Sequence, residues 1–194
     1  MSIGWKPAQA MNRDGTRPGT SAQRSKPRRI ASAPTGEGRF KPVSYGHIEH
    51  KLPKRKYPNL VCAWTNLTVA CQVCNTNKGD YDDPECRLLD PHVDDVEGMV
   101  VFAGPMAFAR KESRTRATIM RLQLNRNGLL FQRTQVLERL NSILDTVQRA
   151  CNEPAVVRAM WFDIDSLTAA DGEYASACRQ FLKWQLQERG LARP

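Results

Sequence analysis

The sequence predicts an α+β protein with a small mixed core, a helical C-terminal part and a basic flexible N-terminal arm. Three observations support this prediction. Short apolar runs separated by turn residues occupy residues 43–104, as expected for short strands and small helices. Apolar residues recur at helical spacing from residue 112 onward. Residues 1–42 are rich in Pro, Gly, Ser and Arg and show neither period. We therefore expect three parts, 1–42, 43–104 and 105–194.

The composition narrows the function classes. A chain of 194 residues suits one folded unit with an extension, and its formal net charge of +9 favours a polyanionic partner such as nucleic acid, an acidic protein or a membrane surface. No apolar run reaches the roughly 18 residues of a membrane span, and the N-terminus lacks the apolar core of a secretory signal. We therefore expect a cytoplasmic protein that does not enter the membrane. In that compartment the six cysteines are expected to be thiols or metal ligands rather than disulfides.

The N-terminal arm carries nine Lys or Arg residues against only Asp14 and Glu37. One interpretation is a flexible arm that adds phosphate contacts independent of sequence. The other is a solubilising tail, or a segment that orders on a partner protein. The sequence leaves both interpretations open.

The segment that follows reads as a hairpin-like element, a loop and a helix. Residues 43–51 can form a short strand, and the apolar run 67–70 follows the polar Asn66. The helix is expected to begin near Asn66 or Thr68 and to end at Lys78-Gly79, a cation followed by a glycine stop. Positions three and four apart share a helix face. That face would carry Cys71, Cys74 and Asn75.

Residues 80–97 invert the charge, with eight acidic residues against Arg87 alone. This acidic segment could supply a metal ligand, repel DNA and so fix its approach, or form only a solvated loop. Residues 98–104 then read as a strand, because β-branched and aromatic residues lie between glycines.

Three helices are expected after this strand, over residues 112–125, 129–151 and 172–189, with Pro154 starting a new segment. Their inward faces are apolar, which favours a role as core and partner surface, and Cys151 and Cys178 are expected in that core. Between residues 110 and 126 six basic residues face one acid. This stripe could follow a phosphate backbone or form an ordinary solvated face.

The stretch from His47 to Asp80 concentrates the residues suited to metal-assisted chemistry. Cutting a phosphodiester requires a base that activates water and a cation that stabilises the developing charge. A neutral histidine is a suitable base at cellular pH, and an adjacent carboxylate is a hard oxygen ligand for Mg²⁺ or Mn²⁺. Glu49-His50 provides that pair.

Together with Asn66-Leu67 and Cys71-x-x-Cys74-Asn75-x-x-Lys78, this pair resembles the HNH endonuclease motif and its ββα-metal fold. The resemblance implies that His50 is the catalytic base. Glu49 and Asn75 would then be metal-binding members, with Asn in place of the usual His at the last position. Asn66 corresponds to the middle Asn of the catalytic motif, which holds the histidine-bearing loop by hydrogen bonds.

A longer run resembles the HNH subunit of Septu-type anti-phage defence systems, which also occurs beside some retrons. The matching segments are IEHKLPK, WTNL, CQVCNTNKGD, LLDP and IMRLQLNRNGLL followed by Arg133, within residues 45–135. This resemblance implies an effector that cuts nucleic acid under the control of an ABC-type ATPase partner. We expect DNA as the substrate, although nothing in the motif selects the sugar and RNA stays an alternative.

Proteins of this kind commonly carry a further cysteine pair before the histidine, and KPVSYGHIEH has none. Cys71 and Cys74 could still bind structural Zn²⁺ with a replacement ligand or could be buried thiols. The candidate replacement ligands are Cys62, Cys86, His47 and His92.

His47 shares a strand face with Glu49 and is either a second metal ligand or a packing residue. The basic residues expected to contact nucleic acid are Lys54, Arg55, Lys56 and Lys78. Two alternatives to the nuclease remain. One is a non-catalytic, zinc-finger-like nucleic-acid-binding module, and the other is an interaction subunit whose catalytic site has decayed.

Overall fold

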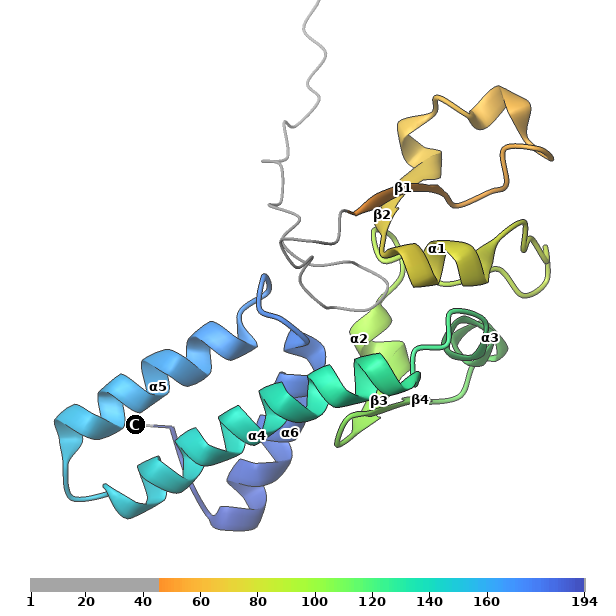
Figure 1. Cartoon of the computed structure of the whole chain (residues 1–194). Coiled ribbons are helices and arrows are strands. Elements are labelled where there is room, and N and C mark those ends of the chain that lie inside the picture. Colours follow the sequence, from red (N-terminus) through yellow and green to blue (C-terminus); the bar gives the residue numbers. More distant parts are fainter. Residues whose placement is uncertain (1–45, 194) are drawn as a thin grey trace, which may run out of the picture.

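The computed structural model describes residues 46–193, so the predicted arm of residues 1–42 lies outside the described part. Within that part the chain forms six α-helices and two small antiparallel sheets, which confirms the α+β class (Figure 1). As Figure 1 shows, one hairpin and its helix lie at one end of the molecule and three long helices at the other.

The first sheet is built from β1 (His47–His50) and β2 (Leu67–Ala70), which pair antiparallel with Glu49 opposite Thr68. Two short 3₁₀ turns, Pro58–Leu60 and Trp64–Asn66, lie in the loop between them. Helix α1 (Gln72–Lys78) follows directly.

The prediction that this helix begins near Asn66 or Thr68 is wrong. Thr68 and Val69 are β-branched and pair with β1, so the helix starts only after Cys71, whose Sγ accepts from the Cys74 amide. The predicted end is confirmed, because α1 stops at Lys78 and Gly79 takes a positive φ of 50°.

A second hairpin follows a short helix α2 (Val96–Met99). Strand β3 (Val100–Ala103) was expected, and β4 (Met106–Ala109) was not. The two strands pair antiparallel across a tight turn in which Gly104 has a φ of 56°. The predicted strand ended at Gly104, and the MAFA segment of β4 has no β-branched residue that would indicate a second strand.

Four longer helices complete the chain: α3 (Ser113–Arg121), α4 (Asn127–Arg149), α5 (Pro154–Thr168) and α6 (Ala175–Arg189). Helix α3 ends before the predicted residue 125, because Gln123 adopts a positive φ of 50°. The segment that begins at Pro154 is itself a helix, with the proline at its first turn, where the missing N–H has no cost.

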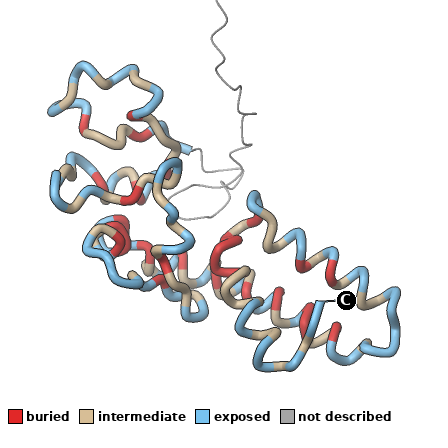
Figure 2. Tube along the Cα trace, turned by 180° about the vertical axis from the view of Figure 1, so that it is seen from behind, coloured by how far each residue is buried: buried red, intermediate tan, exposed pale blue. Residues whose placement is uncertain are grey.

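Two apolar clusters stabilise the described part, and they appear as two groups of buried residues in Figure 2. The first joins β2, α1, the two β3–β4 strands, α3 and the start of α4. The second lies between α4, α5 and α6. A boundary at residue 104 therefore does not separate the two cores, because α3 packs with the first. Cys178 is buried in the second cluster as expected, whereas Cys151 is exposed past the end of α4.

None of the helices in the described residues is both long and apolar enough to cross a lipid bilayer.

Candidate functional site

Asn66 closes the loop between β1 and β2. Its side-chain oxygen accepts from the Leu52 amide at 2.7 Å, and its Nδ2 donates to the carbonyls of Leu52 at 3.1 Å and Leu60 at 3.2 Å. Asn66 is buried, so these bonds also satisfy an amide that would otherwise be costly to bury. Asn66 is the last residue of the connection between β1 and β2, so these bonds tie the start and the middle of that connection to its end.

His50 ends β1, half-buried on the strand face opposite Glu49. Its Nε2 lies 3.0 Å from the Val61 carbonyl. A carbonyl only accepts, so Nε2 must carry the proton and donate. The neutral ring then keeps its lone pair on Nδ1, which is the atom available to accept a proton.

Glu49 points to the inner side of the hairpin and meets Lys78 from α1. The Lys78 Nζ donates to Glu49 Oε1 at 2.7 Å and to the Gly79 carbonyl at 3.2 Å. Their side chains are only 10% and 9% exposed. This is a buried ion pair that ties β1 to α1. Each group of this pair compensates the charge of the other, because either one alone would be an uncompensated buried charge.

The thiols of Cys71 and Cys74 face the guanidinium of Arg126, which precedes α4. Arg126 donates from Nη2 to Cys71 Sγ at 3.4 Å and from Nη1 to Cys74 Sγ at 3.6 Å. No local pattern indicates this partner, which lies more than fifty residues away along the chain.

These contacts separate the two thiols chemically. A hydrogen bond from the Cys74 side chain lowers the pKa of Cys71 to about 5, with further help from the Cys74 amide and the charge of Arg126. The same hydrogen bond, together with burial, raises the pKa of Cys74. Cys71 is therefore the thiolate of the pair at neutral pH.

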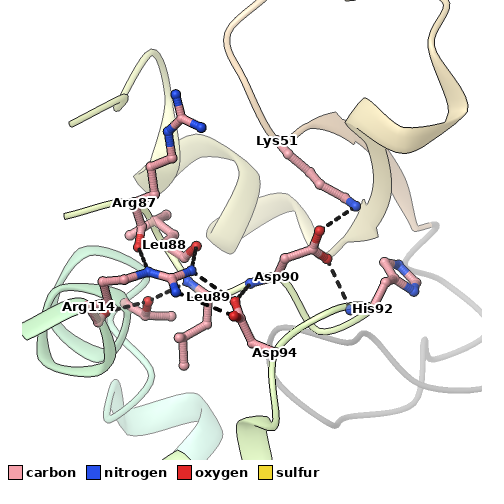
Figure 3. Close-up of polar contacts among 9 residues, drawn as sticks. Lys51, Arg87, Leu88, Leu89, Asp90, His92, Asp94 and Arg114 are labelled. Atoms are coloured by element: carbon pink, nitrogen blue, oxygen red, sulfur yellow. Dashed lines mark hydrogen bonds and ion pairs between the residues drawn. The ribbon is translucent and has the colours of Figure 1, made fainter. Parts of the chain in front are cut away.

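The acidic segment is not a solvated loop. Asp90 accepts a hydrogen bond from Lys51 Nζ at 2.6 Å, and Asp94 accepts one from Arg114 Nη2 at 2.9 Å. Arg114 also donates to the carbonyls of Arg87 and Leu88 (Figure 3). The Asp90 amide is bonded to Asp94 as well. The Leu88–Pro91 motif is thus fixed between the β1–β2 loop and α3.

Further acids of this segment neutralise the loop that follows β1. Asp82 receives Lys56 at 2.7 Å, and Asp80 lies 3.6 Å from Arg55. Of the three residues of this loop that are predicted to contact nucleic acid, Arg55 and Lys56 therefore already have carboxylate partners. All three, Lys54, Arg55 and Lys56, are nevertheless exposed at the surface.

A cavity of about 350 Å³ lies under the hairpin, lined by residues of β1, β2, α1 and the acidic segment. Glu49, Asn66 and Lys78 contribute to its wall, whereas His50 is absent from the lining among the described residues. The predicted base and the cavity therefore lie on opposite sides of β1.

The remaining predicted metal ligands, His47 and Asn75, do not line this cavity. His47 is exposed at the start of β1, and Asn75 is half-buried on α1, one turn before Lys78. Lys78 does not present its ammonium at the surface, so a nucleic-acid contact through it would require release from Glu49.

Neither the predicted Mg²⁺ or Mn²⁺ site nor the predicted Zn²⁺ site is assembled in this conformation of the described residues. Across residues 46–193 no three His, Cys, Asp or Glu side chains gather in a way that could hold a metal ion. The Lys78 ammonium occupies the Glu49 carboxylate, and Arg126 faces the two cysteines where the resemblance implies zinc. The described residues therefore do not fit either ion in this arrangement.

In class, this is a mixed α+β protein in which a hairpin and the helix after it bring together a histidine, an asparagine clamp and a buried carboxylate–ammonium pair. The chain is similar to the Septu protein PtuB of Bacillus thuringiensis, with 30% identity over 109 residues. The match covers 54% of this chain and 42% of the relative, so the chain spans less than half of that protein's length. No family model and no solved structure matches the chain.

Proposed function

We propose that this protein is an HNH-type endonuclease and the nuclease subunit of a Septu-type anti-phage defence system. The observation that carries the proposal is the fixed geometry of His50, with Nε2 held by the Val61 carbonyl and Nδ1 left as the acceptor. The similarity to a Septu protein supports the defence role. The strand–strand–helix order of β1, β2 and α1 agrees with the ββα-metal arrangement that the motif implies.

In this proposal the Nδ1 of His50 takes a proton from water as the water oxygen bonds to phosphorus. The P–O bond to the sugar oxygen on the opposite side breaks in the same step, and that leaving oxygen takes a proton from solvent. The donated Nε2 bond aligns the ring and stabilises the imidazolium that forms. Asn66 acts through the loop, because it fixes the backbone of Leu60 beside Val61. Asn66 is thus a positioning residue for His50.

The proposal includes a requirement for Mg²⁺ or Mn²⁺, and binding of either ion requires the side chains of the site to rearrange. Such an ion would stabilise the negative charge that develops on the phosphate. Glu49 can serve as its ligand only after Lys78 has moved away, and His47 and Asn75 are the neighbouring candidates on β1 and α1. Contact with DNA or with an ABC-type ATPase would have to bring about that rearrangement.

The test is nicking of supercoiled plasmid in Mg²⁺ or Mn²⁺ by the wild type, His50→Ala and Asn75→Ala, with and without the candidate ATPase. Loss of a general base costs about 10²- to 10⁴-fold in rate. The proposal expects a loss of that size for His50→Ala, and cutting by His50→Ala at the wild-type rate would remove the assignment of His50 as base.

A non-catalytic nucleic-acid-binding subunit is the second candidate, and the engaged Glu49–Lys78 pair favours it. This candidate expects DNA or RNA binding without cleavage in any metal, partner present or absent. Metal analysis of the purified protein decides the zinc-finger form. A structural zinc would be present near one equivalent per chain, whereas the Arg126 contacts favour a metal-free cysteine pair.

A further inference from the structure

Trp64 stands out among the exposed side chains of the described part. It is 88% exposed, whereas the buried Trp161 of the second cluster is 5% exposed. An indole exposed to water lacks the large favourable free energy of burial. Packing therefore does not explain an exposed tryptophan in an ordered position. Ile48, 71% exposed, lies on the same strand face as His50, and the exposed Val61 carries the carbonyl that His50 contacts.

The loop holds Trp64 in a fixed place. Trp64 begins the 3₁₀ turn that ends at Asn66, and its carbonyl accepts from the Leu67 amide at the start of β2. Asn66 in turn is bonded to the Leu52 backbone and to the Leu60 carbonyl. Trp64 is therefore presented by an anchored turn.

The same anchors place Trp64 close to His50 and to the cations. Trp64 is three positions after Val61, so their Cα atoms lie within about 11 Å. Lys54 follows Leu52 by two residues, and Leu52 is bonded to Asn66. An exposed aromatic ring, a histidine and a basic run thus share one clamped loop. Aromatic rings beside cations are how proteins bind single-stranded nucleic acid, with bases stacked on the rings and phosphates on the charges.

We propose that Trp64 is a base-stacking platform, and that the substrate of this site presents an unpaired nucleobase beside the bond to be cut. The inference rests on the proposed function and specifies its substrate as a single strand, a loop or a flipped base. A base inside a duplex is stacked on both faces and offers no face to an indole. The ligand chemistry is shared by DNA and RNA, so both must be compared.

The experiment measures binding, separately from cleavage. Fluorescence anisotropy is recorded on full-length protein in a His50→Ala background, without added metal, for a labelled oligothymidine strand, an oligouridine strand and a blunt duplex. The variants are Trp64→Leu, which keeps apolar bulk, and Trp64→Phe, which keeps an aromatic face. Trp184→Leu is the matched control, an exposed tryptophan on α6.

Trp64→Leu should weaken binding of the strands by about 5- to 150-fold and leave the duplex nearly unchanged. Trp64→Phe should retain most of the affinity yet lose most of the quenching of tryptophan fluorescence that a bound strand causes. Trp184→Leu should bind like the parent. The difference between the thymidine and uridine strands identifies the preferred sugar.

Three results would overturn the inference. One is unchanged strand binding by Trp64→Leu. This result counts against the inference also when the same variant no longer binds an ATPase partner. Another is an equal loss for strand and duplex. The third is no binding of any nucleic acid by the parent. Strand binding that depends on Trp64 without cleavage in any metal would leave this inference standing and would remove the nuclease proposal.

Discussion

Around α1 the buried side chains include a carboxylate, an amide and an ammonium, whereas the buried members of the cluster between α4, α5 and α6 include no charged side chain. Glu49, Asn66 and Lys78 are held in place by specific bonds. Leu140, Leu144 and Ile164 are held by packing alone.

A buried ion pair seldom stabilises a protein more than apolar residues of the same shape would. The polar interior around α1 is therefore better explained by function than by stability. The apolar cluster of α4, α5 and α6 is better explained by stability than by chemistry. This difference predicts how substitutions in each region will behave.

The largest effect on stability is expected for Lys78→Met, which leaves Glu49 as an unpaired buried carboxylate. Breaking such a pair costs about 3–5 kcal/mol of unfolding free energy, measured by urea denaturation. The control is Glu49→Leu/Lys78→Met, which removes both charges and should recover most of the loss. If the double variant is as unstable as the single one, the loss comes from packing and not from the unpaired charge, and the contrast between the two regions fails.

Leu140→Ala should destabilise the protein by about 3 kcal/mol, because it opens a cavity at a fully buried position of α4. Glu138→Ala, an exposed neighbour, provides the comparison and should change little. Nucleic-acid binding by the folded fraction should be preserved in both, since neither residue belongs to the hairpin. Loss of binding by folded Leu140→Ala would show that the two regions act as one.

Asn66→Ala should cost about 1–3 kcal/mol, because it leaves the backbone groups of Leu52 and Leu60 without their bonds. Amide exchange read residue by residue should accelerate at Leu52. Exposed Thr65→Ala is the control and should leave exchange unchanged. Equal exchange in Asn66→Ala and the wild type would mean that the loop is held by other contacts.

The smallest effect concerns the cysteine pair. The pKa of Cys71 is about 5 in the folded protein against an ordinary 9.0, so the unfolded chain binds the extra proton between these values. Its contribution to stability is full above pH 9, falls as the pH falls from about 9 to about 5, and is lost below that. Cys74 stays protonated in this window and does not oppose it.

Arg126→Gln should shift the pH midpoint of Cys71 alkylation upward, followed by mass spectrometry of the labelled peptides with exposed Cys62 as the internal reference. The shift should be partial, because the hydrogen bond from Cys74 is the larger cause of the lowered pKa. A midpoint near that of Cys62 in the wild type would refute the thiolate assignment.

The sequence predicts local features of the site well and distant pairings poorly. The stop of α1 at Lys78-Gly79 follows from the conformational freedom of glycine. The Glu49–Lys78 pair joins residues 29 positions apart, so no local pattern predicts it, and Lys78 was expected to contact nucleic acid instead. Nothing local distinguishes Arg126 from the other arginines of its stripe, although it meets both thiols.

The acidic segment illustrates the same limit. Its charge is plain in the sequence, but its partners Lys51, Lys56 and Arg114 come from two other segments. Charge runs are usually solvated, and only tertiary structure shows that this one is paired. Strand β4 was missed for a local reason, because its four residues, MAFA, include no β-branched residue and so carry a weak strand signal.

The most direct test of the central claim is the rate of Mn²⁺-supported cleavage by His50→Ala with and without free imidazole, in the presence of the candidate ATPase. His50 as general base predicts a rate about 10²- to 10⁴-fold below wild type, with partial recovery when imidazole supplies the missing base. Asn66→Ala, which keeps the histidine, should show no such recovery. Cleavage by His50→Ala at the wild-type rate would contradict the account.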